Sequence, residues 1–240
     1  MLADRQTRSG VDVKALLRQS PLFEGLDGAV LDEMLSHFRR ETWKQGRRIS
    51  EQESGQRFHI ILSGRLKMGQ INPDTGRMVT LFLLQPGDAF DVISLLDGQP
   101  NPVLLEARDD LLMLSTPMRE ARRWIEEHPV FNRSFLPYLG QQMRSLANLA
   151  GDLALHDTET RLARLILRHI QPEAPGQPLR LIHNLSHESL AEMIGSVRVV
   201  VNRQLQHWQR EGVVVTRRGE LVIKELETLL KKAMHLPGKH

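Results

Sequence analysis

Residues 186–223 read SHESLAEMIGSVRVVVNRQLQHWQREGVVVTRRGELVI, and this stretch decides the fold of the C-terminal third of the chain. Ser186 is a favoured helix N-cap, and Leu190 and Ile194 recur at helical spacing. Gly195 follows directly, and a residue without Cβ adopts a left-handed backbone at little cost. The pattern therefore predicts a short helix that starts after Ser186 and ends in a sharp glycine turn.

A second helix is predicted from Val197 to Glu211, with an apolar side formed by Val201, Leu205 and Trp208. Gly212 ends this helix. The run Val213–Ile223 that follows is predicted to be a β-hairpin whose turn is centred near Arg218-Gly219. Helix, glycine turn, second helix and basic hairpin is the order of a winged helix-turn-helix.

In a winged helix-turn-helix, the second helix presents its exposed side to base edges in the major groove. Guanidinium groups at Arg198 and Arg203 match guanine or a phosphate, and the amide of Asn202 matches adenine. Arginines of the hairpin reach phosphates, which orient a protein without reading sequence. The alternative is that these arginines are only solvated. The predicted contacts to double-stranded DNA are Arg198, Val199, Asn202, Arg203, Ser186, Ser196, Gln206, Arg217 and Arg218.

Composition restricts the class of protein. The 240 residues allow two compact domains, and 40% hydrophobic with 25% charged residues is ordinary for a globular chain. No apolar run approaches a membrane span, and the polar start MLADRQTRSG is unlike a secretory signal. We therefore expect a cytoplasmic protein without a membrane partner.

The chain has no cysteine, which excludes disulfides, thiolate zinc sites, cysteine-held iron–sulfur clusters and a cysteine nucleophile. No metal site or catalytic residue is predicted. From Arg161 onwards there are 13 Lys and Arg against 7 Asp and Glu, whereas residues 1–160 hold 19 against 22. A basic C-terminal third is compatible with a polyanionic partner or with a merely solvated surface.

Upstream, helical spacing over residues 11–38 is broken at Pro21. Short apolar runs separated by turn residues then extend from Thr42 to Leu114, which indicates a small barrel or sandwich. Helical spacing returns at about Pro117 and continues to Ile170.

One row of this helical region has the spacing of a coiled-coil seam, and a second row of mostly small residues lies beside it, namely Met143, Ala147, Ala150 and Ala154. The first row favours contact with the same helix of a second subunit. The alternative is that the helix packs on its own barrel. The residues predicted to form the dimer contact are Leu139, Gln142, Leu146, Leu149, Leu153 and His156.

The fold class expected is α+β: an N-terminal jelly-roll β-barrel, a long dimerisation helix and a C-terminal winged helix-turn-helix. The expected domains are residues 11–116 for the barrel with its N-terminal helices, 117–156 for a helical region with the dimerisation helix at about 133–156, and 157–240 for the DNA-binding domain.

Several motifs of the chain resemble the CRP/FNR superfamily of bacterial transcription regulators. Residues 190–212 follow that family's helix-turn-helix, Ile61–Gly64 and Pro86–Asp88 resemble the glycine turns of its cyclic-nucleotide-binding barrel, and His156-Asp157 resembles its hinge. The order of these parts covers nearly the whole chain. The resemblance implies a homodimer that binds a palindromic operator, contacts RNA polymerase and responds to a small effector.

The chain departs from the family pattern in its second helix. Val199 stands where many members have a base-reading glutamate, so it offers only apolar contact, for instance to a thymine methyl. Val197 replaces the usual Ser or Thr at the helix start, and Ser196 is expected to cap the helix instead.

The sensor departs further. Asn101-Pro102-Val103 stands where cyclic-AMP-binding members have Arg-Ser-Ala, Val92 or Ile93 falls at the ribose glutamate, and Leu146-Ala147 replaces hydroxyl residues that meet the adenine. An anionic phosphate needs a cation or converging amides, so we expect an effector other than cyclic AMP. The predicted effector pocket, unless these residues simply fill a core, is lined by Ile93, Leu95, Leu96, Val103, Leu105, Leu146 and Leu149.

Two alternatives remain open at this point. Some relatives sense gases through haem, which needs an axial ligand, and His37, His59 and His156 are the candidates, although His59 reads as a satisfied barrel residue. A ligand-binding module that acts through protein contacts is the alternative from another class. An enzyme is not expected, because the chain has no nucleophile-elbow, Walker or His-Glu-x-x-His motif.

Overall fold

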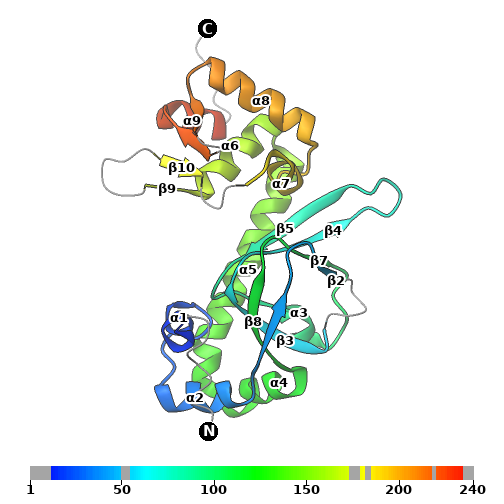
Figure 1. Cartoon of the computed structure of the whole chain (residues 1–240), viewed down its shortest axis with the longest axis vertical. Helices are drawn as coiled ribbons and strands as arrows, with labels where there is room; N and C mark the ends of the chain where they lie inside the picture. The colour runs from blue at the N-terminus through cyan, green and yellow to red at the C-terminus, as the bar shows by residue number, and fades with distance from the viewer. Residues whose placement is uncertain (1–11, 50–54, 173–178, 182–184, 218–219, 235–240) are drawn as a thin grey trace. The chain divides into compact units, whose positions relative to one another are not determined.

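The computed structural model describes residues 12–49, 55–172, 179–181, 185–217 and 220–234 (Figure 1). The chain forms two compact units, one of residues 1–71 with 81–145 and the other of residues 72–80 with 146–240. The helices are α1 (Val13–Gln19), α2 (Gly28–Ser36), α3 (Val92–Asp97), α4 (Met118–Glu127), α5 (Pro129–Leu155), α6 (Thr158–Arg168), α7 (His187–Met193), α8 (Arg198–Arg210) and α9 (Leu226–Ala233). The strands are β1 (Arg39–Trp43), β2 (Arg48–Ile49), β3 (Arg57–Ser63), β4 (Leu66–Ile71), β5 (Met78–Leu84), β6 (Ala89–Phe90), β7 (Leu104–Ala107), β8 (Leu111–Pro117), β9 (Ile170–Pro172), β10 (Leu179–Leu181), β11 (Val214–Arg217) and β12 (Glu220–Ile223).

The first unit contains the expected barrel, built from two four-stranded sheets. Their strand orders are β1-β8-β3-β6 and β2-β7-β4-β5, with the ladders β1–β8, β3–β8, β3–β6, β2–β7 and β4–β7 antiparallel. Apolar side chains of both sheets share one core, in which Trp43, Phe90, Leu105 and Met113 are buried. Successive side chains of a strand point to opposite faces, and on β3 Ile61 lies in this core whereas Phe58 and Ile60 lie in a second core on the other face.

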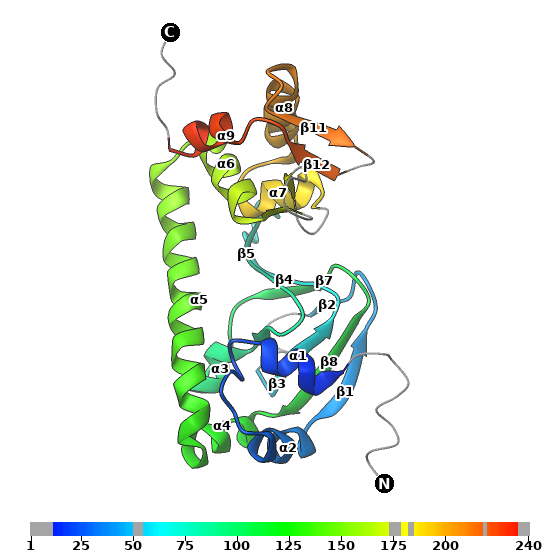
Figure 2. The same ribbon diagram turned by 90° about the vertical axis from the view of Figure 1, so that its left-hand side faces the viewer.

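A second core of this unit joins the barrel to its helices. Leu17, Met34, Trp124, Phe131 and Phe135 are buried there, on α1, α2, α4 and the first turns of α5. Figures 1 and 2 both show α2 and α4 together at one end of the barrel. Separate helices α1 and α2 confirm the break predicted at Pro21, because a proline cannot continue the hydrogen-bonding ladder of a helix.

Helix α5 is continuous over 27 residues and begins at Pro129, slightly earlier than the sequence predicts. The Ser134 hydroxyl donates to the Leu22 carbonyl at 2.9 Å. The Tyr138 hydroxyl donates to the Ala89 carbonyl at 3.3 Å and accepts from the Ala89 amide at 3.2 Å. Both contacts fix one face of this part of α5 to the unit that contains the barrel.

Besides residues 72–80 and the last turns of α5, the second unit contains α6 to α9 and a sheet in the order β11-β12-β10-β9. Its core buries Leu162, Ile166, Val201, Leu205 and Trp208, so the predicted apolar side of the second helix is confirmed. Strand β9 and helix α9 were not predicted from the sequence. No helix among the described residues is long and apolar enough to cross a membrane.

Candidate nucleic-acid interface and sensing pocket

Helix α7 starts and stops as the sequence predicts. The Ser186 Oγ accepts a hydrogen bond from the Ser189 amide at 3.1 Å, which satisfies one of the free donors of the helix start. Gly195 has a φ of 61°, and a Cβ placed there would lie 2.6 Å from the Leu153 Cδ2 atom. The backbone angle therefore favours glycine at the turn between α7 and α8, and a Cβ there would also force the Leu153 side chain to shift.

Helix α8 begins without a side-chain cap. Val197 occupies the N-cap position and has no capping hydrogen bond, so the expectation that Ser196 caps this helix is wrong. The physical reason is register: the Ser196 amide donates to the Ala191 carbonyl at 2.8 Å, which keeps Ser196 in the preceding turn. The amide groups of the first turn of α8 are left without a side-chain acceptor from the N-cap.

The outward side of α8 is polar and cationic apart from one residue. Arg198, Arg203 and Gln206 are exposed, and Asn202 is half-buried. Among the described residues, neither Arg198 nor Arg203 has an acidic partner. Val199 stands on this side with 76% of its surface exposed. We call these five residues the reading face of α8.

The opposite side of α8 is held firmly in place. The Trp208 indole donates to a Glu159 carboxylate oxygen at 2.9 Å, and the Lys232 ammonium lies 3.0 Å from the same oxygen. Lys232 also pairs with Glu211 at 3.0 Å. Burial alone would raise the pKa of Glu159, but Trp208 and Lys232 outweigh it and lower that pKa. A charged Glu159 on α6 thus links α8 to α9.

The hairpin of β11 and β12 is antiparallel with Val214 opposite Ile223, as expected for a wing. The Gln209 amide donates to the Thr216 hydroxyl at 2.7 Å and ties this hairpin to α8. Arg217 ends β11, and its side chain, like all of Arg218, lies outside the described residues.

The barrel contains a pocket of about 320 Å³ that sequence patterns did not reveal. At its centre, the buried imidazole of His59 lies between two carboxylates, 3.4 Å from Asp91 Oδ2 and 3.7 Å from Glu41 Oε2. These distances are long for hydrogen bonds and short enough for ion pairs. The pocket is lined by Glu41, Trp43, Arg47, Ile49, Gln56, Arg57, His59, Phe90, Asp91 and Leu105.

The electrostatics of this pocket favour a charged imidazole. Burial opposes protonation of His59, but Asp91 and Glu41 together outweigh that effect and raise its pKa. The pKa of Glu41 is lowered far below its usual range, chiefly by His59, with burial acting in the opposite direction. The ring also stacks on Phe90 with centroids 4.4 Å apart. We call His59, Glu41 and Asp91 the buried triad.

Backbone strain marks the same pocket. Asp91 has a φ of 63° and is the single non-glycine residue with a positive φ among the described residues. Such a conformation costs on the order of 1 kcal/mol and persists where surrounding contacts hold it. The sequence could not reveal the triad, because the pairing of His59 with Phe90 across β3 and β6 brings together residues far apart in the chain.

The matches to known families agree with this architecture. A model of the cyclic nucleotide-binding domain matches residues 41–128, and a model of the Crp-like helix-turn-helix domain matches residues 160–232. The chain belongs to the CRP/FNR superfamily. It is a transcription regulator of CRP/FNR type, and its relatives are regulators rather than enzymes.

Relatives and solved structures cover most of this CRP/FNR chain. A CRP-like cAMP-activated global transcriptional regulator of Mycobacterium tuberculosis is 26% identical over 221 residues, 91% of this chain and 98% of the relative. The cyclic AMP receptor protein of Thermus thermophilus is 29% identical and covers 92% and 100%. A CooA mutant from Carboxydothermus hydrogenoformans shares the fold with a TM-score of 0.73 at 21% identity, covering 86% and 94%.

In this CRP/FNR chain, the predicted dimer row of α5 is half-buried by the chain itself. Leu139 packs against the core of the first unit, and Leu153 contacts Gly195 in the second. The neighbouring row repeats every three or four residues and is mainly exposed: Leu136 and Met143 are 63% and 71% exposed. The members of this exposed row are Leu136, Gly140, Met143, Ala147, Ala150 and Ala154.

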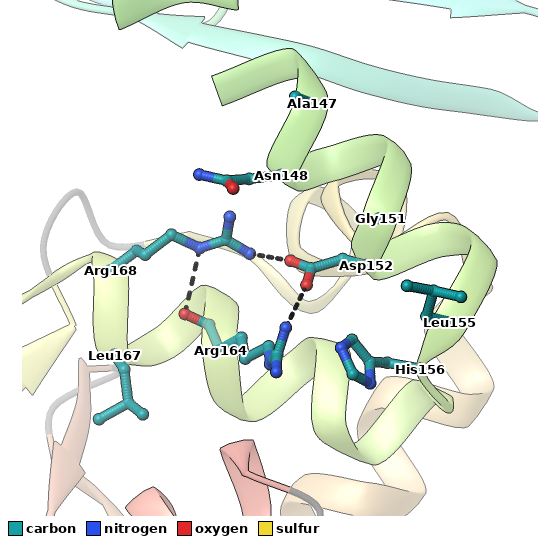
Figure 3. A pocket seen from close by; sticks show the side chains of 9 residues that line it. All are labelled: Ala147, Asn148, Gly151, Asp152, Leu155, His156, Arg164, Leu167 and Arg168. Atoms are coloured by element: carbon teal, nitrogen blue, oxygen red, sulfur yellow. Dashed lines mark hydrogen bonds and ion pairs between the residues drawn. The ribbon is translucent and has the colours of Figure 1, made fainter. Parts of the chain in front are cut away.

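The end of α5 is clamped to α6, as Figure 3 shows. The buried carboxylate of Asp152 accepts from Arg164 at 2.9 Å and also from Arg168. Arg164 further donates to the Ala233 carbonyl at 2.8 Å. Asp152 therefore joins the last turns of α5 to the helix-turn-helix unit. The clamp borders a pocket of about 450 Å³ that His156 also lines.

The residues predicted for an effector pocket fall into separate environments. Leu95 lies in the core shared with the helices, whereas Val103 and Leu105 lie in the core between the sheets. Ile93 and Leu96 are 47% and 52% exposed. Leu146 and Leu149 are half-buried on α5. Of this set, Leu105 alone lines the barrel pocket.

The histidines considered as haem ligands are engaged elsewhere or lie apart from that pocket. Both ring nitrogens of His59 face carboxylates, which leaves none directed at an iron atom. The His37 Nε2 atom lies 3.2 Å from Arg123, and its Nδ1 atom lies 3.8 Å from Glu120. The described residues of the barrel pocket therefore do not fit an axially bound haem.

Proposed function

We propose that this CRP/FNR regulator binds a roughly palindromic double-stranded DNA site as a homodimer, with α8 in the major groove. The observation that carries the proposal is the reading face of α8. Arg198 and Arg203 remain exposed and without an acidic partner among the described residues, while the other side of their helix is locked by Trp208 and Glu159. A rigid helix with free guanidinium groups is what direct readout of guanine requires.

The exposed row of α5 supports a dimer. Its members recur at the spacing of a coiled-coil seam, and small residues at four positions allow two helices to approach closely. The predicted row that starts at Leu139 is partly used by its own chain, so we assign the intersubunit contact to the neighbouring row. A two-fold dimer presents two copies of α8 to two half-sites about one helical turn apart.

The proposed effector is a small molecule other than cyclic AMP. The relatives from Mycobacterium tuberculosis and Thermus thermophilus carry cyclic AMP in their names, but Asn101-Pro102-Val103 offers this chain no guanidinium for a cyclic phosphate. We propose the barrel pocket around the buried triad as its site, because that pocket combines aromatic walls with converging charged groups. Effector binding would shift the protein between two conformational states, and α5 would transmit this shift to the DNA-binding unit. In one of these states the DNA-bound regulator would contact RNA polymerase.

Selection of bound DNA from a random pool by the full-length protein tests this function. The expected result is an inverted repeat whose half-sites lie about one helical turn apart. Enrichment of no sequence, or of a single half-site, would contradict the proposed mode of binding. Three selections are run in parallel: one without any additive, one with cyclic AMP and one with a small-molecule cell extract. We expect the extract, and not cyclic AMP, to increase the enrichment of bound DNA. An equal increase with cyclic AMP would contradict the effector assignment.

A further inference from the structure

Two valines are exposed at the start of the helix that we propose to read DNA. Val199 is 76% exposed and Val197 is 52% exposed. Neither belongs to the core of the second unit, whereas Val201 on the same helix is fully buried. Single exposed apolar residues are common on protein surfaces and need no explanation. Two of them flanking Arg198, on a helix whose other outward residues are polar, point to a function.

The chemistry of the major groove narrows that function. Each base pair presents hydrogen-bonding groups there, and thymine alone adds an apolar group, its 5-methyl. Val199 can neither donate nor accept a hydrogen bond from its side chain. Its position is next to Arg198 and four residues before Arg203, so Val199 and Arg203 share one side of α8. A base that Val199 contacts therefore neighbours a base that the guanidinium group of Arg198 or Arg203 contacts.

The start of α8 supports this placement. Val197 has no capping group, and although the Val200 amide donates to the Val197 carbonyl at 3.0 Å, the Arg198 and Val199 amides at the start of this 13-residue helix can meet a phosphate oxygen. A phosphate held there would bring the first turn, and with it both valines, close to the base edges. A capping Ser or Thr hydroxyl would instead occupy one of those amides.

We propose that Val199, assisted by Val197, reads the 5-methyl group of a thymine that neighbours a guanine contacted by Arg198 or Arg203. The inference rests on the proposed binding of DNA and specifies one base of the bound half-site. The operator half-site then contains one thymine that is selected by its methyl group and not by its hydrogen-bonding pattern.

Deoxyuridine provides the test, because it differs from thymidine only in lacking that methyl. The probe is the duplex enriched by the full-length protein, with each thymine replaced in turn by deoxyuridine in both half-sites. Affinity is measured by fluorescence anisotropy at one fixed salt concentration, since salt alone shifts it strongly. At one position we expect a loss of roughly 4-fold per half-site, or about 15-fold for the symmetric duplex.

Two variants locate the reader. Val199→Ala removes an exposed side chain and is expected to bind the two duplexes within about 2-fold of each other. Leu230→Ala, at a 42% exposed position on α9, is the matched control and is expected to keep the full discrimination. Thermal melting of both variants checks that they are folded.

The possible outcomes distinguish a failure of methyl reading from a failure of the proposed DNA binding. Wild-type protein that ignores deoxyuridine at every position would overturn methyl reading while leaving DNA binding intact. Discrimination that survives in Val199→Ala would overturn the assignment to Val199. Failure to enrich any sequence would overturn the proposed DNA binding itself.

Discussion

The reading face of α8 and the buried triad of the barrel use charged side chains in opposite ways. Arg198 and Arg203 stand in solvent with no acidic partner among the described residues, so folding gains little from them. His59 is buried between Asp91 and Glu41, and removing either carboxylate deprives the buried imidazole of one of its two ion-pair partners. The difference predicts where substitutions act: on affinity for a partner in the first region, and on the stability of the subunit in the second.

The largest effect of a substitution, on dimerisation and DNA affinity, is expected at the exposed row of α5. This row is apolar, unlike the reading face and the buried triad. Met143→Asp places a carboxylate in the proposed intersubunit contact, where burial without a partner is costly. We expect a monomer by analytical ultracentrifugation and a loss of about 100-fold or more in affinity for a palindromic duplex, because binding of two half-sites is no longer linked.

Leu139→Ala is the matched variant on the half-buried row. Since Leu139 packs against its own core, we expect a subunit destabilised by about 2 kcal/mol that still dimerises. A dimeric Met143→Asp protein together with a monomeric Leu139→Ala protein would reverse the assignment of the two rows.

The next effect concerns the triad. Asp91→Ala removes the carboxylate beside His59 and leaves a Cβ at a φ of 63°, and we expect a loss of about 3 kcal/mol in the free energy of unfolding. Asp91→Gly removes the same carboxylate but relieves the backbone, so its loss should be smaller by about 1 kcal/mol. Urea unfolding measures both.

Glu126→Ala, at an exposed position on α4, serves as the control for these two variants and should change the free energy of unfolding little. If Asp91→Ala and Glu126→Ala were equally stable, the triad would have no structural role.

A third effect is expected on the reading face. Arg203→Ala should weaken binding of the enriched duplex by about 2 kcal/mol, or roughly 30-fold, and leave the melting temperature unchanged. Arg210→Ala, exposed at the far end of the same helix, is the charge-matched control. Equal losses in the two variants, measured by anisotropy at several salt concentrations, would indicate a general electrostatic effect without base readout.

The smallest effect is the pH dependence of the triad. Because the folded pKa of His59 is raised, its contribution to stability is complete below its ordinary value of 6.5 and is lost as pH rises through the folded pKa. The difference in unfolding free energy between wild type and His59→Gln should therefore shrink from about pH 6 to about pH 9. Two further cationic side chains, Arg57 and Arg47, also line this pocket. A difference that grows with pH would contradict a protonated His59.

Local signals were sufficient for the helix-turn-helix. The Ser186 cap, the Gly195 turn and the buried side of α8 follow from neighbouring residues, because capping and periodicity act within a few positions. The expected cap at Ser196, although it was also inferred from neighbouring residues, was wrong by one position. A shift of one residue in the start of α8 depends on how the preceding turn closes, which sequence spacing does not specify.

By itself, the sequence determined the order of barrel, long helix and winged unit, the absence of cysteine chemistry and the lack of an arginine at Asn101-Pro102-Val103. Only the tertiary structure decided which row of α5 is exposed. Both rows have the same spacing, and the core of the first unit, by taking up Leu139, makes them different. The triad also needed the fold, because strand pairing brings His59 and Asp91 together across residues that share no local pattern.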